Sequence, residues 1–256
     1  MKIQHIRNAC IIIHYNDHRI LVDPCLNPKS SLPPYTFFRK KPRLNPLSDL
    51  PLSAAPGLSE ITCGLITHCR YGHFDHLDKE GIQLLMSKHV PTYCNSLDEP
   101  FLKRHHIYTI PLYLNQRSDF LTGHITPFPT KHGYGIVGTL MGRGAGFFIE
   151  LPGDQSIYIS GDTVMTKTVR HILKNLRPAI SILNAGTATL DFGKPILMSI
   201  SEQLDFIRAA PGRVIAVHLD AFNHCLTTKD ILREAILKEG LSDKVLIPQD
   251  GEFIEL

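Results

Sequence analysis

The chain has 256 residues, 43% of them hydrophobic, so it can bury a full core. Its 27 basic and 24 acidic residues give a formal net charge of +3, a near balance that argues against a nucleic-acid-binding protein. No apolar run reaches the ~18 residues that span a bilayer, and the start of the chain lacks the apolar stretch of a secretion signal. We therefore expect no specific nucleic-acid partner and no membrane insertion.

The first half of the chain predicts strands, then an alternation of strands and helices. β-Branched runs separated by turn residues indicate the strands, and apolar residues at helical spacing indicate the helices. Residues 26–58 are rich in proline, serine and leucine, which predicts a long loop of the kind that often serves as a lid or binding loop. The expected strands are 1–6, 10–15, 19–24, 63–68 and 90–95, and the expected helices are 79–89 and 96–106, with Ser96 as N-cap of the second.

The second half repeats this order. Strands are expected first, with residues 142–146 as a hairpin turn, and an alternation of helices and strands follows. The expected strands are 107–110, 119–130, 138–151, 156–162, 179–185, 213–219, 244–248 and 251–256, and the expected helices are 163–176, 199–210 and 227–240. We therefore predict an α+β protein, a four-layer αββα sandwich in which helices cover two packed sheets, folded as a single domain over 1–256.

Six cysteines are spread along the chain without a CxxC pair or compact disulfide spacing. In a chain of this length they indicate reduced thiols, and we expect a cytoplasmic protein. Cys69 and Cys225 are exceptions, because they lie beside histidines. The sequence leaves open whether the chain forms a homo-oligomer.

Several apolar strands end in residues that bind metals. His68 follows Gly64-Leu-Ile-Thr67, Asp162 follows Gly161 after a short strand, and His218 ends the strand Val214–Val217. His132 comes after a loop. Loops at the ends of strands, held by a rigid sheet, are where functional sites are assembled.

The densest cluster is His73-x-Asp75-His76, just after His68. Imidazole and carboxylate ligands suit one or two divalent ions, zinc or manganese above all. Along an extended segment alternate side chains point in opposite directions, so Asp75 and His76 can bind one ion while His68 and His73 bind another. Asp162 is suited to be the anion that both ions share, because Gly161 lets the backbone turn tightly before it.

These residues resemble the metallo-β-lactamase superfamily of hydrolases, and its ascorbate-6-phosphate lactonase branch in particular. The family pattern T-H-x-H-x-D-H, then His, Gly-Asp and His, is matched in order by Thr67-His68, by His73-x-Asp75-His76 and by His132, Asp162 and His218. Segments such as 196–203 and 247–256 resemble later elements of the branch. The resemblance implies the αββα fold, these seven metal ligands, and a catalytic Asp75 that orients the nucleophilic water or receives its proton.

The sequence departs from the family pattern at one point. The family has one residue between its first two histidines, whereas four residues, 69–72, stand between His68 and His73. Either a bulge returns His68 to the metal, or His68 is displaced and Cys69 or His224 fills its place. Asp23 also has two interpretations, a hydrogen bond to the site or a cap on the turn before Pro24.

The expected activity is that of a metal-dependent hydrolase acting on a small, anionic lactone or ester. Two alternatives stay open: a phosphodiesterase acting on nucleotides or lipid headgroups, and a non-catalytic metal-containing binding protein. Substrate contacts can come from the enlarged loop, from the neighbours of His132, or from later strand ends. The candidates are Arg70, Tyr71, Lys131, Asn184 and His224.

Overall fold

The computed structural model describes residues 1–70 and 72–256. Tyr71, one of the predicted substrate contacts, lies outside the described residues. Within the described ranges, helices that are long and apolar enough to cross a membrane are absent. All six cysteines are buried free thiols.

The first sheet has seven strands in the order β14-β1-β2-β3-β4-β5-β6. Its β14-β1-β2-β3 part is antiparallel, and β3 to β6 pair in parallel. The parallel part sends the carboxyl ends of its strands toward one edge, where the predicted site residues follow. The strands are β1 (Lys2–Arg7), β2 (Cys10–Tyr15), β3 (His18–Val22), β4 (Cys63–Ile66), β5 (Thr92–Asn95), β6 (Thr109–Leu112) and β14 (Phe253–Glu255).

The second sheet also has seven strands, in the order β13-β12-β11-β10-β9-β8-β7. Here β7 to β10 are antiparallel, and β10 to β13 pair in parallel. The two sheets are therefore built alike. The strands are β7 (Ser118–Phe120), β8 (Gly123–Pro129), β9 (Ala145–Glu150), β10 (Ile157–Ile159), β11 (Ile180–Asn184), β12 (Arg213–Val217) and β13 (Val245–Leu246).

The core lies between the sheets and continues beneath the helices on both outer faces. Ile11 and Ile13 of β2 pack toward the second sheet, whereas Cys10 and Ile12 pack toward the helices on the outer face. Successive side chains of a strand point to opposite faces, so a strand that is covered on both faces needs a continuous apolar run. This explains why the sequence of β2 does not alternate between apolar and polar residues.

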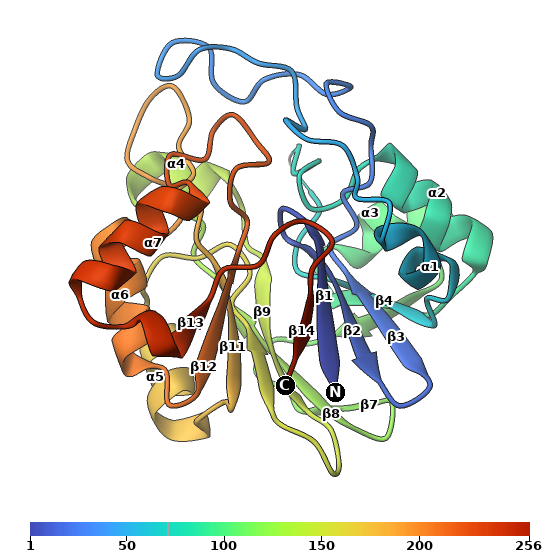
Figure 1. Cartoon of the computed structure of the whole chain (residues 1–256). Helices are drawn as coiled ribbons and strands as arrows, with labels where there is room; N and C mark the ends of the chain where they lie inside the picture. The colour runs from blue at the N-terminus through green and yellow to red at the C-terminus, as the bar shows by residue number, and fades with distance from the viewer. Residues whose placement is uncertain (71) are drawn as a thin grey trace.

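Helices cover both outer faces, which confirms the predicted four-layer αββα sandwich (Figure 1). The first sheet carries the first three helices, and the second sheet carries the last three, with a short helix before β9. They are α1 (Ala54–Ser59), α2 (Lys79–Lys88), α3 (Glu99–Arg104), α4 (Gly135–Leu140), α5 (Lys167–His171) with a π-helical turn (Ile172–Leu176), α6 (Ile200–Ala209) and α7 (Lys229–Lys238); a 3-10 turn spans Ser242–Lys244.

Helix α1 begins within the segment 26–58 that was expected to be a loop, and the expected strand 119–130 is two strands, β7 and β8. Three further boundaries also differ from the sequence-based expectations. The segment 138–151 was expected to be one strand, but its start belongs to α4, and residues 142–144 connect α4 to β9 instead of forming a hairpin turn. Helix α3 begins at Glu99, because the Ser96 amide still bonds to the Leu112 carbonyl of the neighbouring strand, 2.9 Å away. Helix α5 begins at Lys167, with the Thr166 side chain as its cap.

Residues 26–53, which we call the strap, form most of the long loop predicted over 26–58, and the rest of that segment belongs to α1. The strap runs across the top of the molecule from the first half to the second (Figure 1). Its amides at Tyr35 and Phe37 donate to Asn223 and Asp191, both from the second half. At its start, the buried Arg7 guanidinium donates to the carbonyls of Cys25 and Asn27, each 2.9 Å away. The strap is therefore fixed at its start and in its middle, over the edge where the parallel strands finish.

Candidate metal centre

The predicted ligands converge where strands of both sheets end. His68 follows β4, His132 follows β8, Asp162 follows β10 and His218 follows β12, and all four are buried. Gly161 has a φ of +58°, and a Cβ there would lie 2.8 Å from the Ala145 carbonyl oxygen. Glycine is therefore required before Asp162, as expected, so that the backbone can turn and the carboxylate can enter the site.

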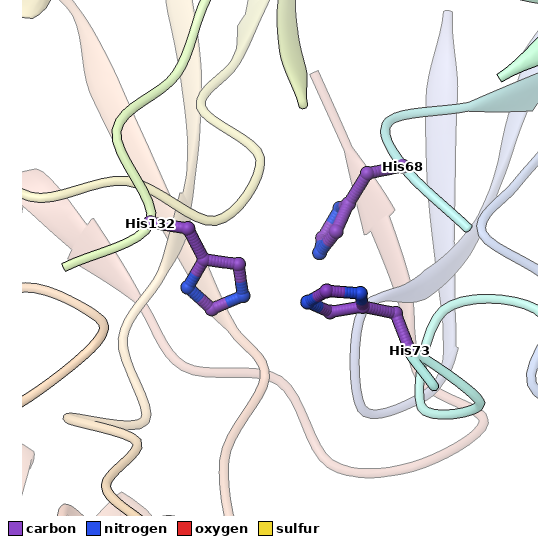
Figure 2. Close-up of side chains that lie close together, drawn as sticks. All are labelled: His68, His73 and His132. Atoms are coloured by element: carbon purple, nitrogen blue, oxygen red, sulfur yellow. The ribbon is translucent and has the colours of Figure 1, made fainter. Parts of the chain in front are cut away.

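Three histidines form the first ligand group: His68, His73 and His132 (Figure 2). Each offers one ring nitrogen, and these nitrogens lie within 4.8 Å of one another. The Nδ1 atoms face away from the group: that of His68 meets the Thr67 hydroxyl at 3.0 Å, that of His73 meets the Arg70 carbonyl, and that of His132 meets the Ile196 carbonyl at 2.9 Å. The Nε2 atoms of His68 and His73 are buried without a hydrogen-bond partner. Anchored rings with free inward nitrogens fit a bound cation.

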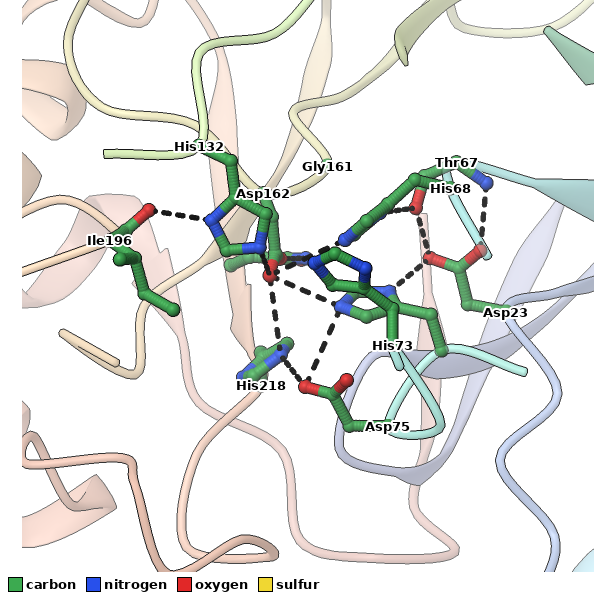
Figure 3. A network of polar contacts seen from close by, with 12 residues as sticks. Asp23, Thr67, His68, His73, Asp75, His132, Gly161, Asp162, Ile196 and His218 are labelled. Atoms are coloured by element: carbon green, nitrogen blue, oxygen red, sulfur yellow. Dashed lines mark hydrogen bonds and ion pairs between the residues drawn. The ribbon is translucent and has the colours of Figure 1, made fainter. Parts of the chain in front are cut away.

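The second ligand group combines Asp75, His76, Asp162 and His218, whose ligand atoms also lie within 4.8 Å of one another (Figure 3). His218 Nε2 lies 3.3 Å from Asp75 Oδ2, and His76 Nε2 lies 3.2 Å from Asp162 Oδ2. The same Asp162 oxygen is 3.2 Å from His132 Nε2 of the first group. Asp162 therefore stands between the groups, which is the position expected of a shared anion.

The enlarged loop after His68 does not carry this residue out of the site. His68 is 5% exposed, and its Nε2 lies 3.8 Å from Asp162 Oδ2. The extra residues close a turn in which the His73 and Phe74 amides bond back to the carbonyls of Arg70 and Gly72. Cys69 packs into the core under the first-sheet helices, so it does not fill a ligand position.

Residues around the ligands hold them in place. Asp23 accepts hydrogen bonds from the Thr67 amide (2.8 Å) and hydroxyl (2.6 Å), and its Oδ2 lies 2.8 Å from His76 Nδ1. Asp23 therefore belongs to the site and does more than cap the turn before Pro24. Asn184 donates to Asp162 Oδ1 at 2.7 Å. Orienting partners of this kind fix the tautomer and direction of metal ligands.

The charges at the two groups differ in the metal-free protein. Burial raises the pKa values of Asp75 and Asp162, but the cationic His76 and other histidines outweigh it and hold both well below the ordinary value. Burial lowers the pKa of His76, and the Asp162, Asp75 and Asp23 carboxylates overcome this and raise it to about 10. Burial and neighbouring histidines hold the pKa of His68 well below its ordinary value and lower the pKa of His73 to about 4. His68 and His73 thus offer neutral imidazoles, and the second group holds buried ion pairs.

The model of the beta-lactamase superfamily domain matches residues 18–219 of this sequence. The chain belongs to this superfamily. UPF0173 protein YddR from Bacillus subtilis strain 168 is 28% identical over 256 residues and is matched over 98% of both chains. The narrower resemblance to the ascorbate-6-phosphate lactonase branch stays a prediction.

Solved structures of superfamily type align with the whole chain. A possible metal-dependent hydrolase from Veillonella parvula DSM 2008 has a TM-score of 0.91 at 28% identity, with 100% of this chain and 99% of that one covered. An isothiocyanate hydrolase from Delia radicum gut bacteria has a TM-score of 0.89 at 29% identity and the same coverage. The predicted class, a metal-dependent hydrolase of the metallo-β-lactamase superfamily, is confirmed at the level of family and fold.

The predicted substrate contacts lie in different surroundings. His224 is buried, with Nε2 3.6 Å from Asp75 Oδ2. Arg70 donates from Nε to Asp98 at 2.7 Å, and Lys131 is exposed, with its ammonium 5.1 Å from the centre of the Tyr134 ring. Asn184 donates a hydrogen bond to Asp162, as described above. These contacts show where each side chain is held, and their roles toward a substrate stay predictions.

Sequence reasoning missed one residue at the centre, Tyr35 of the strap. Its hydroxyl lies 2.9 Å from Asp75 Oδ1 and 2.8 Å from the Gly72 carbonyl oxygen. Its ring stacks on Phe74 at 4.3 Å and lies 4.4 Å from the His224 ring. No local pattern marks a tyrosine within a proline-rich loop as a site residue, because the contact arises only when the strap crosses the sheets.

Proposed function

We propose that this protein is a hydrolase in which one or two divalent ions, zinc or manganese, activate a water that attacks a small lactone or ester. The supporting observation is a set of buried histidine ring nitrogens that lack hydrogen-bond partners and lie around two carboxylates. Unpaired buried polar atoms are costly, so several of them facing one point indicate a ligand that they hold. The proposed ligands are His68, His73, Asp75, His76, His132, Asp162 and His218.

Bound ions would lower the pKa of a water molecule toward neutrality and polarise the oxygen that the water attacks. Asp75 is the proposed catalytic residue. Its Oδ1 is held by the Tyr35 hydroxyl, which leaves Oδ2 facing His218 and His224. A carboxylate held at one oxygen can orient a water through the other and accept its proton.

An isothiocyanate is a second candidate substrate, favoured by the full-length similarity to an isothiocyanate hydrolase. Its central carbon is an electrophile, as is a lactone carbonyl carbon, and the same arrangement of residues serves both. One water is consumed in each case: a lactone gives the hydroxy acid, and an isothiocyanate gives an amine and carbonyl sulfide.

A phosphodiester carries a permanent negative charge and is a weaker candidate, because the nearby Arg70 and Lys40 side chains already bond to Asp98 and to the Cys225 carbonyl.

Elemental analysis and turnover by matched variants test this proposal. Purified protein should contain about one to two equivalents of zinc or manganese. Asp75→Asn should abolish turnover of lactones, esters or isothiocyanates, while Asp119→Asn, at an exposed aspartate on β7, should leave it unchanged. Turnover of bis-nitrophenyl phosphate alone would favour the phosphodiesterase. A folded protein with metal but without turnover on any of these would favour the non-catalytic binder.

A further inference from the structure

A cavity of about 380 Å³ lies beside the candidate metal centre. This volume is at the lower end of the range for small-molecule sites. Its walls come from the strap, from α4 with the residue after it, and from the loop that follows β11. The apolar and aromatic lining residues include Tyr35, Phe37, Val137, Leu140, Leu190 and Phe192.

Each wall of the cavity is tied to the centre. Tyr35 lines the cavity with its ring and reaches Asp75 with its hydroxyl. Helix α4 begins just after His132. The loop that carries Leu190 and Phe192 continues to Ile196, whose carbonyl oxygen lies 2.9 Å from His132 Nδ1. A molecule in the cavity would therefore lie against Tyr35, which contacts Asp75, and against the loop that continues to the Ile196 contact with His132.

The cavity offers no free charge to a ligand within its described lining. The charged lining residue, Asp191, uses its carboxylate to accept hydrogen bonds from the strap amides of Phe37 (2.9 Å), Phe38 (2.8 Å) and Arg39 (3.1 Å). The cationic side chains of the strap do not belong to the described lining of the cavity; they are Lys29, Arg39, Lys40, Lys41 and Arg43. Two of them are held elsewhere: Arg39 donates to the Gly193 carbonyl, and Lys40 donates to the Cys225 carbonyl. An anionic substrate group, which the sequence suggested, finds no cationic partner in this lining.

Large apolar side chains are exposed at this cavity. Leu140 is 72% exposed and Phe192 is 76% exposed, and the neighbouring Ile136 is 81% exposed. Scattered apolar residues on a surface need no explanation, but a cluster at the rim of a cavity marks a binding site. Burial of such side chains against a ligand contributes about 25 cal/mol per Å² of apolar area removed from water.

We propose that this cavity binds the uncharged hydrocarbon part of the substrate, an aryl or branched alkyl group, and so presents the electrophilic carbon to the water that Asp75 orients. The proposal rests on the proposed hydrolase function and narrows it: the substrate is neutral and amphipathic instead of anionic. Tyr35 links the two parts of the site, because one face of the pocket and the hydrogen bond to Asp75 belong to the same side chain.

Binding is tested without turnover by fluorine NMR on the metal-loaded protein, with 4-fluorophenethyl alcohol as a neutral arene that cannot be hydrolysed. Leu140→Lys should weaken its binding about tenfold, because the charge enters an apolar wall. Leu52→Lys is the matched control, since Leu52 is 96% exposed and does not line the cavity. The anionic analogue 4-fluorophenylpropionate should bind more weakly than the alcohol.

Turnover gives the second readout, with methyl against benzyl isothiocyanate and γ-valerolactone against γ-phenyl-γ-butyrolactone. In Leu140→Lys the kcat/KM for the aryl member of each pair should fall about tenfold more than that for the methyl member. Equal loss for both members, tighter binding of the anion, or arene binding that is the same in wild type and Leu140→Lys would overturn the proposal. A wild-type protein that binds no arene, but whose oligomeric state changes in Leu140→Lys, would also overturn it. Arene binding without any metal-dependent turnover would instead reject the hydrolase function and keep the cavity assignment.

Discussion

Replacement of Asp23 by asparagine should separate metal affinity from folding. Asp23 is 1% exposed, and its two oxygens receive the Thr67 amide, the Thr67 hydroxyl and His76 Nδ1. The carboxylate only accepts hydrogen bonds, so His76 must carry its proton on Nδ1 and direct the Nε2 lone pair toward the metals. An asparagine keeps one oxygen for the Thr67 amide but points its NH2 group at His76. That group can pair only with an unprotonated Nδ1, and the ring proton then moves to Nε2.

The size of the effect follows from these contacts. Loss of an orienting partner weakens metal binding by about 10–100-fold, or roughly 1.4–2.8 kcal/mol. The metal-free protein should lose only about 1 kcal/mol, because most of the hydrogen bonds can be remade with donor and acceptor exchanged. Zinc affinity is measured by competition with a chelator, and stability by urea denaturation of the metal-free protein, with Asp119→Asn as control. Wild-type zinc affinity in Asp23→Asn would refute the reasoning.

Further predictions concern the other contacts of the centre. Tyr35→Phe should keep the ring stack, lower the free energy of unfolding by about 1 kcal/mol and reduce kcat, because Asp75 loses a hydrogen-bond donor; unchanged kcat would contradict the role given to this tyrosine. The pKa of His76 is raised to about 10, so the metal-free protein should lose stability as pH rises from 6.5 toward 10, which urea denaturation at several pH values checks. Zinc should bind more tightly over that range because binding releases the proton, which binding calorimetry in buffers of different ionisation heat checks. Gly144→Val should displace His68, since even a Cβ at Gly144 would lie 3.0 Å from His68 Cβ. The metal content measured by elemental analysis should then fall by one equivalent. An unchanged metal content would show that the surrounding residues can move to accept the valine.

The sequence predicted the fold well because both faces of the central strands are buried. The continuous apolar runs of β2 and β12 are unambiguous signals, and parallel strands bring their carboxyl ends to one edge. His68 and His218, which lie within two residues of the ends of β4 and β12, could therefore be assigned to one site from the sequence. The end of α4 could not be predicted, because GTLM has no strong preference for helix or strand, and its conformation depends on close packing of Gly138 against Gly133.

The contacts that support the ligands were beyond sequence reasoning. Asp23 gains its role only because β3 pairs with β4 and brings it to Thr67, and Tyr35 gains its role only because the strap crosses to the second half. The fate of His68 depended on the shape of the four-residue insertion. The turn closed by Arg70 and Gly72 carbonyls absorbs the extra length, which spacing alone does not reveal.

A crystal structure of the protein loaded with zinc or manganese, with anomalous scattering recorded at the metal edge, tests the central claim most directly. The account predicts one peak among His68, His73 and His132, a second among Asp75, His76, Asp162 and His218, and Asp162 between them. A single peak that excludes His68 would remove the first ligand group. A fully folded protein without any peak at these residues would contradict the metal-dependent mechanism itself.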